Sequence, residues 1–486
     1  MKFLKILTIA SLLITTSCDL EIQPENKSTI DNLLAEDGGI ETATNGNYAL
    51  LKDVLAFGGA GPNSNNDYTR HLYQMSEFAA DNVMYTQFSS DPLYLVFTRE
   101  HVPGQLNSAY FWFIAYRMIL GTNLIINNAE EGVDGRTDQL IGENYFLRAM
   151  ASFDLLRFFA KSYNQGRDNP GIVLRTTASE PTLEARATVG ESYDQVVADL
   201  LKAEALMTED NDRGVEYASK LAAQALLCRV YLYMENYEKV IEYADKVEAS
   251  GIRLATNSEY LDNFANTPSS AESIFVIKWT LQDHRGKNGS IGSMYYDDGN
   301  NNGWGEVFAS QTFRDLIETH PEDIRNDLIV SPGGTKNGYP IHYIIKFSGQ
   351  DGVVNLCSPQ YLRYSEVVLN RAEANAHLSN DAAAIADVND IRVRAGLSGA
   401  ALYDETDLGG KTVLDVVLEE RRLELAYEGH RGFDLVRNQR DLVRNYEGIH
   451  QENGDTRVSI PYDDDRWIFY IPLQELTINS LVRQNP

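Results

Sequence analysis

Aromatic residues gather in two segments of the chain that are rich in Gly, Asn and Asp. The later segment carries Tyr295, Tyr296 and Trp304 around the run 297–303. The earlier one, 58–66, leads into a second group: Asn65, Asn66, Asp67, Tyr68 and Tyr73. A sugar ring has an apolar C–H face and a rim of hydroxyls, so its site needs an aromatic plane with Asn, Asp or Arg at the edge. The two segments are therefore predicted to be ligand loops, although a peptide would use the same planes and each ring, taken singly, could equally pack in the core.

Part of the later segment resembles a calcium loop. Asp298, Asn300 and Asn302 place side-chain oxygens at alternate positions, and Gly303 stands at the sixth position, as in the first half of an EF-hand. The twelfth position requires a bidentate Glu, but Ala309 occupies it. A plain surface loop is therefore favoured over a calcium site.

A dense group of charged residues within 419–437 could suggest an acid/base or anion site. Its members are Glu419, Glu420, Arg421, Arg422, Glu424, Glu428, Arg431, Asp434 and Arg437. Opposite charges at i,i+3 spacing, Glu419 with Arg422 and Glu428 with Arg431, favour a structural ion-pair network on a helix and its exit turn. No His pair has zinc-binding helical spacing, and no Ser or Cys nucleophile with a base can be identified. A glycosidase needs only two suitably spaced carboxylates, so 70 acidic residues leave that activity open.

Helices must position these loops. Apolar residues at helical spacing predict long helices over 104–133 and 138–163, and Thr188 with Glu191 forms a capping box before another. Two helical pairs of tetratricopeptide length follow, one over 221–247 broken at Glu235-Asn236 and one over 359–396 ended by Gly396. Trp112 lies on an apolar helix and is assigned to the core. No linker divides the chain, so we expect one large, mainly α domain of helical hairpins.

The region 269–354 has a different texture. Residues 274–277 and 341–347 are predicted to be short strands, and the Trp304 loop lies between them. Loops of this kind carry function more often than scaffolds do.

The N-terminus carries a secretion signal. Lys2 and Lys5 accompany a short apolar run, and small residues then lead to Cys18. This arrangement resembles a bacterial lipobox, with Thr15 where that pattern usually has Leu, and it implies a signal peptide over 1–17 and acylation of Cys18. An ordinary secreted protein with a chance Cys18 is the alternative. The other two cysteines, Cys228 and Cys357, are expected to be buried free thiols.

Five blocks of sequence resemble one known family. They are GENYFLRA (142–149), RAEA (371–374), VNDIRVRAG (388–396), LEERRLELAYEGHRGFDLVR (418–437) and the ending 471–486 with Ile471-Pro472, Glu475 and Asn479. Together they resemble the SusD-like (SusD/RagB) family of outer-membrane nutrient-binding lipoproteins, in that family's order. The region 269–354 carries little of the resemblance.

The resemblance implies both architecture and role. It implies a SusD-like domain over 18–486, with an N-terminal helical part about 30–260, a variable ligand-loop region about 269–354 and a C-terminal helical part about 355–486. It further implies four tetratricopeptide-like pairs and a surface-exposed protein anchored to the outer membrane through acylated Cys18. Such a protein catalyses nothing: it binds an oligosaccharide, or a peptide in RagB-type members, and delivers it to a SusC-type TonB-dependent transporter.

Other function classes are less well supported. A net charge of -28 argues against nucleic acid as a partner. A secreted glycoside hydrolase and a tetratricopeptide adaptor that binds only proteins stay as alternatives. Neither periodicity nor composition names the ligand.

Overall fold

The structure is a computed structural model, and it describes residues 30–486 except 64, 179–181, 209–212 and 451–456. Helices form about half of the described chain, and the strands are two to four residues long, paired in two-stranded sheets. The predicted mainly α fold is therefore confirmed. The predicted signal peptide and Cys18 lie outside the described residues.

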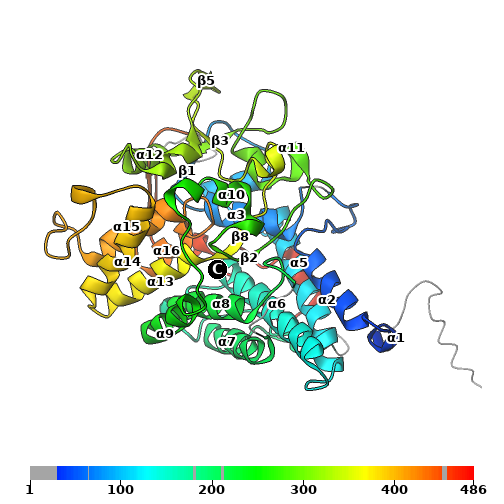
Figure 1. Ribbon diagram of the computed structural model, residues 1–486. Coiled ribbons are helices and arrows are strands. Elements are labelled where there is room, and N and C mark those ends of the chain that lie inside the picture. Colours follow the sequence, from blue (N-terminus) through cyan, green and yellow to red (C-terminus); the bar gives the residue numbers. More distant parts are fainter. Residues whose placement is uncertain (1–29, 64, 179–181, 209–212, 451–456) are drawn as a thin grey trace, which may run out of the picture.

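Long helices form one side of the molecule, where α6 packs against both α5 and α7 (Figure 1). The helices of this half are α1 (Ile30–Ala35), α2 (Gly39–Ala49), α5 (Leu106–Asn128), α6 (Gly135–Phe159) and α7 (Val189–Leu206). The predicted capping box of α7 is confirmed, since the Glu191 amide donates to the Thr188 hydroxyl at 3.1 Å. Helix α5 is long and apolar enough to cross a membrane, but more than half of its most apolar window is buried in the protein. It therefore serves as a core helix, and Trp112 on it is buried as predicted.

Two helical hairpins follow, and both were predicted from the sequence. They are α8 (Lys220–Tyr233) with α9 (Tyr237–Glu248), and α13 (Tyr364–His377) with α14 (Asp381–Arg394). The first breaks at Glu235, whose φ of 57° ends α8, and Gly396 at φ 96° follows α14. Helix α13 packs against α9 and α15, so the hairpins join through it.

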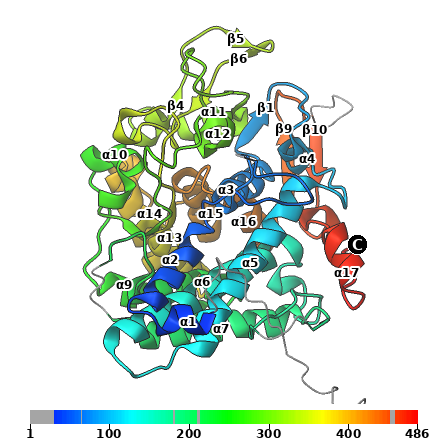
Figure 2. The ribbon, with the colours of Figure 1, turned by 90° about the vertical axis from the view of Figure 1, so that its right-hand side faces the viewer.

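Shorter helices and the strands make up the rest of the molecule, and many of them lie above the long helices in Figure 1. The helices are α3 (Tyr68–Phe78), α4 (Pro92–Thr98), α10 (Asp262–Ala265), α11 (Gly286–Gly289), α12 (Gln311–Ile317), α15 (Val413–Glu424), α16 (Arg431–Arg437) and α17 (Leu473–Ile478). The antiparallel strand pairs are β1 (Val83–Tyr85) with β3 (Val307–Ala309), β2 (Ser273–Val276) with β8 (Gln360–Arg363), β4 (Ile329–Val330) with β7 (Tyr343–Ile344), β5 (Thr335–Lys336) with β6 (Tyr339–Pro340), and β9 (Leu442–Asn445) with β10 (Arg457–Ile460). The hairpin β5–β6 projects from the body (Figure 2). Helix α17 lies lower, near the C-terminus (Figure 2).

One of the two predicted strands is confirmed, and the other is shorter than predicted. The expectation for 274–277 is confirmed by β2. The expectation for 341–347 is wrong in extent, because only Tyr343 and Ile344 form a strand and the chain then turns, with the Ser348 amide donating to the Ile345 carbonyl.

The largest hydrophobic core cluster extends from Tyr48 to Val482 and includes residues of both halves of the chain, and four smaller clusters are described besides it. Cys228 and Cys357 are free and buried, as predicted. Because these clusters are buried and packed, the loops above them have a rigid support.

Candidate functional site

A cavity of about 460 Å³ opens beside the sheet β1–β3. It is lined by Asn65, Arg70, Gln87, Phe88, Ser89, Ser90, Asp91, Pro92, Asn288, Met294, Trp304 and Glu306. Phe88 and Trp304 are 55% and 42% exposed, so two aromatic side chains stand open to solvent among polar groups. The cavity thus combines apolar planes with hydrogen-bonding edges.

The sheet β1–β3 brings the two walls together. Tyr85 pairs with Val307, and beyond the pair the Thr86 amide and hydroxyl both donate to the Glu306 carbonyl, at 3.2 and 3.1 Å. The segment 87–91, which follows β1, therefore lies near the segment 304–306, which precedes β3.

The Trp304 loop is held by hydrogen bonds at its base. The Trp304 amide donates to the Ser293 carbonyl at 2.7 Å, and the Lys336 ammonium donates to the Trp304 carbonyl at 2.5 Å. The Asn355 side chain donates to the Asn302 carbonyl at 2.9 Å. These bonds fix the backbone that carries the indole.

A cation covers one face of the indole. The Lys287 ammonium lies 4.0 Å from the Trp304 ring centroid, and it also donates to the Asn301 side chain at 2.6 Å. Such a cation–π contact restricts the orientation of the ring. Lys287 covers one face of the indole and not the other.

The polar wall is organised around Arg70. Its Nη1 donates to the Asn65 carbonyl at 2.8 Å, and its Nη2 lies 3.5 Å from Asp91. Asp91 also caps α4, because its Oδ1 accepts from the Leu93 amide at 2.9 Å. Both charged side chains are thus engaged with the scaffold and held at fixed positions.

Glu306 is the other carboxylate of the cavity. Partial burial raises its pKa above the usual range for Glu, Lys336 opposes that rise, and the nearby Asp91 adds to it. A carboxyl with a raised pKa keeps its proton to a higher pH than an ordinary Glu does, and in its protonated form Glu306 can both donate and accept a hydrogen bond.

The structure brings only some of the predicted ligand residues together. Asn65 and Trp304 both line the cavity. Asn66 and Tyr296 are half-buried and do not line the cavity. The Asn66 amide oxygen lies 3.2 Å from His71 Nε2, and the Tyr296 ring packs edge-on against Tyr343.

Four other predicted ligand residues are buried, which corrects the sequence interpretation. Asp67 caps α3 through the Arg70 amide, and the Tyr68 hydroxyl donates to Asp154 at 2.6 Å. Tyr73 donates to the Gln360 carbonyl at 2.7 Å, and Tyr295 is 1% exposed in the core. Because their rings and carboxylate face inward, they do not line the cavity.

Sequence reasoning missed the wall formed by 87–92. Phe88 stands among Gln, Ser and Asp residues there, a composition close to that of the two loops that were singled out. This composition could have marked the segment as a ligand loop. Its place opposite Trp304 could not be predicted, because it depends on the pairing of β1 with β3, which joins residues more than two hundred positions apart.

The charged group at 419–437 is a buried ion-pair network, as predicted, but its pairs differ. Glu419 binds Lys411, and Glu428 binds Lys346 and Arg363. Their expected partners, Arg422 and Arg431, both bind Asp81 instead. The Glu428–Arg431 pair does not form because α15 ends at Glu424, and Tyr427 and Gly429 have positive φ. Glu419 and Arg422 both lie within α15, but each binds a partner outside that helix.

The weak calcium hypothesis gains no support from geometry. The Asp298 carboxylate accepts hydrogen bonds from the side-chain amides of Asn300 and Asn302, at 3.1 and 2.8 Å. Within the described part of the chain, no group of three His, Cys, Asp or Glu residues could hold a metal ion.

Comparison with known proteins gives consistent matches along the chain. A family model described as "SusD family" matches residues 234–486, and one described as "Starch-binding associating with outer membrane" matches residues 46–232. The curated protein "SusD-like protein P38" of Formosa agariphila is 23% identical, with 99% of this chain and 97% of that protein covered. "SusD-like protein P2" of the same organism is 25% identical, over 90% of this chain and 91% of that protein.

Solved structures share the fold. A SusD superfamily protein from Bacteroides thetaiotaomicron superposes with a TM-score of 0.81 at 26% identity, covering 94% of this chain and all of that one. A protein described as a putative sugar binding protein from Bacteroides vulgatus gives a TM-score of 0.78 at 26% identity, covering 92% and 98%.

Proposed function

We propose, from the premise that this chain belongs to the SusD family, that it binds an oligosaccharide in the Trp304 cavity and delivers it to a SusC-type TonB-dependent outer-membrane transporter. The observation that carries the binding proposal is the pair of exposed aromatic side chains, Trp304 and Phe88, on a polar cavity of about 460 Å³. A stacked sugar would use the indole face opposite Lys287. Its hydroxyls would reach Asn65, Asn288 and Glu306.

We propose that the protein binds its ligand and does not hydrolyse it. Of the two carboxylates in the cavity, Asp91 caps α4 and pairs with Arg70, so it is held in place by two structural bonds. A glycosidase needs two free carboxyl groups placed across the scissile bond. The similarity to a protein described as sugar-binding points the same way.

Attachment to the outer membrane is the second part of the proposal. The lipobox-like sequence before Cys18 would supply acylation, and several acyl chains on one residue give stable attachment. The family model described as associating with outer membrane supports this location. Surface exposure and the transporter partner belong to the same proposal.

A binding experiment with matched variants tests the ligand proposal. Wild type, Trp304→Ala, Trp304→Phe and Leu281→Ala are titrated calorimetrically with maltoheptaose, other oligosaccharides and a set of neutral peptides. We expect Trp304→Ala to lose affinity at least about tenfold, equal to about 1.4 kcal/mol. Trp304→Phe should recover part of it, and exposed Leu281, outside the cavity, should be silent.

The outcomes separate the function classes. If only peptides bind, and their affinity also depends on Trp304, the ligand is a peptide, as in RagB-type members, and not an oligosaccharide. Binding of neither class would favour a protein-binding adaptor.

Cys18→Ser tests the location. The change should move the protein from the membrane to the soluble fraction and remove a barrel protein from affinity purifications, and an unchanged distribution would contradict anchoring.

A further inference from the structure

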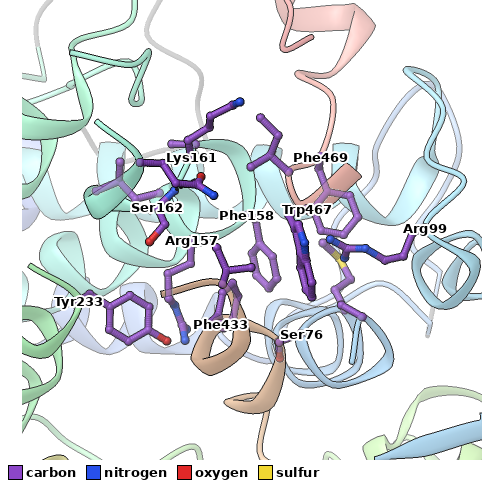
Figure 3. Close-up of a pocket in the computed structure, with 18 of the residues that line it drawn as sticks. Ser76, Arg99, Arg157, Phe158, Lys161, Ser162, Tyr233, Phe433, Trp467 and Phe469 are labelled. Atoms are coloured by element: carbon purple, nitrogen blue, oxygen red, sulfur yellow. Dashed lines mark hydrogen bonds between the residues drawn. The ribbon is translucent and has the colours of Figure 1, made fainter. Parts of the chain in front are cut away.

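A second, smaller cavity lies between α3, α6, α16 and the segment 467–469 (Figure 3). Its volume is about 40 Å³. A single water needs about 10–15 Å³, so the space is that of roughly three waters. Most of its wall is apolar, formed by rings such as Phe158, Phe433, Trp467 and Phe469.

Arg99 places a buried guanidinium in this wall. The residue ends α4 with a φ of 61°, and its side chain stacks on Trp467 with 4.4 Å between guanidinium carbon and ring centroid. It is 1% exposed, and its Nε and Nη2 have no hydrogen-bond partner. Figure 3 shows the guanidinium directed toward Trp467, among the side chains that border the cavity.

The other cations nearby each have an ionic or carbonyl partner, which sets Arg99 apart. Arg157, which also lines the cavity, pairs with Asp154, although its Nε has no partner. Arg444 donates to the carbonyls of Phe78 and Ala80 at 2.9 and 3.0 Å. Lys161 pairs with Asp465 at 2.7 Å, and Arg466 pairs with Asp464 at 2.8 Å. The carboxylates around the cavity are therefore engaged, and among the described residues none forms an ion pair with Arg99.

A buried cation without a partner is costly, since an uncompensated charge loses its hydration. The surroundings add to that cost: burial, Arg444 and Arg466 lower the pKa of Arg99 to about 9, against the opposing charge of Asp464. Buried polar groups without a protein partner often bind a water or an ion. The cavity beside Arg99 has room for one.

We propose that this cavity binds a small monoanion, chloride or a one- or two-carbon carboxylate, against the guanidinium of Arg99. The aromatic wall fits a methyl group or a weakly hydrated halide, and the volume excludes a sugar or a long acyl chain. The anion would hold segment 467–469 against the end of α4. This site is separate from the Trp304 cavity, which contacts α4 at its other end, and the proposal does not rest on the sugar-binding role.

Thermal unfolding in matched salts tests the site. Wild type, Arg99→Met and Arg444→Met are unfolded at constant ionic strength in sodium gluconate, whose anion is too large for the cavity, with increasing replacement by chloride or by acetate. We expect the wild-type midpoint to rise by about 1–3 °C and to saturate. Whichever anion saturates at the lower concentration is the better ligand.

The two variants should behave differently. Arg99→Met removes the unpaired charge, so its midpoint should equal or exceed wild type in gluconate and should not respond to chloride or acetate. Arg444→Met should be less stable in all three salts yet keep the response. An unresponsive wild type, or an Arg99→Met response equal to wild type, would overturn the proposal.

A measurement on the wild type alone covers the case in which Arg99→Met does not fold. Chloride-35 resonance lines broaden when the ion exchanges with a protein site, so we expect saturable excess broadening that acetate competes away. Absence of broadening together with a flat acetate response would likewise refute the site.

Discussion

Nη1 of Arg363 lies 2.6 Å from Oε1 of Glu424, and both side chains are buried. Arg363 ends β8 and Glu424 ends α15. The same carboxylate binds Arg394 of α14 at 2.5 Å and Arg325 of the variable region at 3.4 Å. One carboxylate therefore joins the helical hairpins to the region that carries the ligand loops.

Replacing Glu424 with Ala should strongly destabilise the protein. The change leaves three buried guanidinium groups without a shared partner, and breaking such a buried pair costs about 3–5 kcal/mol. Urea denaturation measures the loss. Glu419→Ala is the control, because the ion pair that Glu419 forms is with partly exposed Lys411, and its loss should cost less than about 1 kcal/mol. Equal losses in the two variants would contradict a structural role for the network.

Asp67 should make stability depend on pH near neutrality. Burial raises the pKa of this carboxyl to about 7, against the opposing effects of the Arg70 amide and the charges of Arg70 and Arg285. A raised folded-state pKa means that the contribution is complete below about pH 4 and is lost as pH rises through 7. Between those values the loss is about 1.4 kcal/mol per pH unit.

Asp67→Asn tests this dependence, since the Asn oxygen can still accept from the Arg70 amide while the amide group replaces Oδ2, which has no partner. From pH 5 to pH 7 the variant should gain about 2–3 kcal/mol relative to wild type in urea denaturation. The exposed helix cap Asp134, changed to Asn, should show no such gain. A constant difference between wild type and Asp67→Asn would mean that the carboxyl is ionised throughout.

Local sequence patterns predicted the helices because their information is local. Apolar spacing and a capping box define α5, α6 and α7, and the break at Glu235 separates α8 from α9. The family resemblance extended this to the whole fold. The extent of the 341–347 strand was missed because its length depends on pairing with β4 rather than on its own residues.

The candidate site was predictable only in part. Trp304 and Asn65 do line the cavity, since aromatic and amide residues in Gly-rich loops favour the surface. Composition does not show which way a ring points, and Tyr68 turns into the core because it follows the cap Asp67 at the start of α3. Phe88 enters the site through the long-range pairing of β1 with β3, which no local pattern contains.

Glu306→Gln should separate binding from hydrolysis. If the protein only binds, wild type incubated with an oligosaccharide ligand releases no new reducing ends, and Glu306→Gln keeps binding. Because the pKa of Glu306 is raised, wild-type affinity should change between pH 4 and pH 7, and the variant's should not. New reducing ends from wild type, lost in Glu306→Gln, would instead identify a hydrolase.

Gly303→Ala should weaken ligand binding without touching a ligand-facing side chain. Gly303 is buried beneath the loop, and a Cβ there would lie 1.8 Å from the Tyr296 carbonyl oxygen and 2.6 Å from Asn355 Nδ2. The backbone must move, and Trp304, the next residue, moves with it. We expect about a tenfold loss of oligosaccharide affinity, or about 1.4 kcal/mol, in calorimetry.

Gly61→Ala is the matched control, because Gly61 lies in the other Gly-rich loop, has no positive φ and has no atom within 4 Å of a built Cβ. It should bind as wild type does. If Gly303→Ala also bound normally while Trp304→Ala did not, the indole would tolerate displacement, so the bonds from Asn355, Lys336 and Ser293 would not be what orients it. If oligosaccharide affinity falls in Gly303→Ala and Trp304→Ala but not in Gly61→Ala, binding depends on where the indole lies. One change displaces the Trp304 indole and the other removes it.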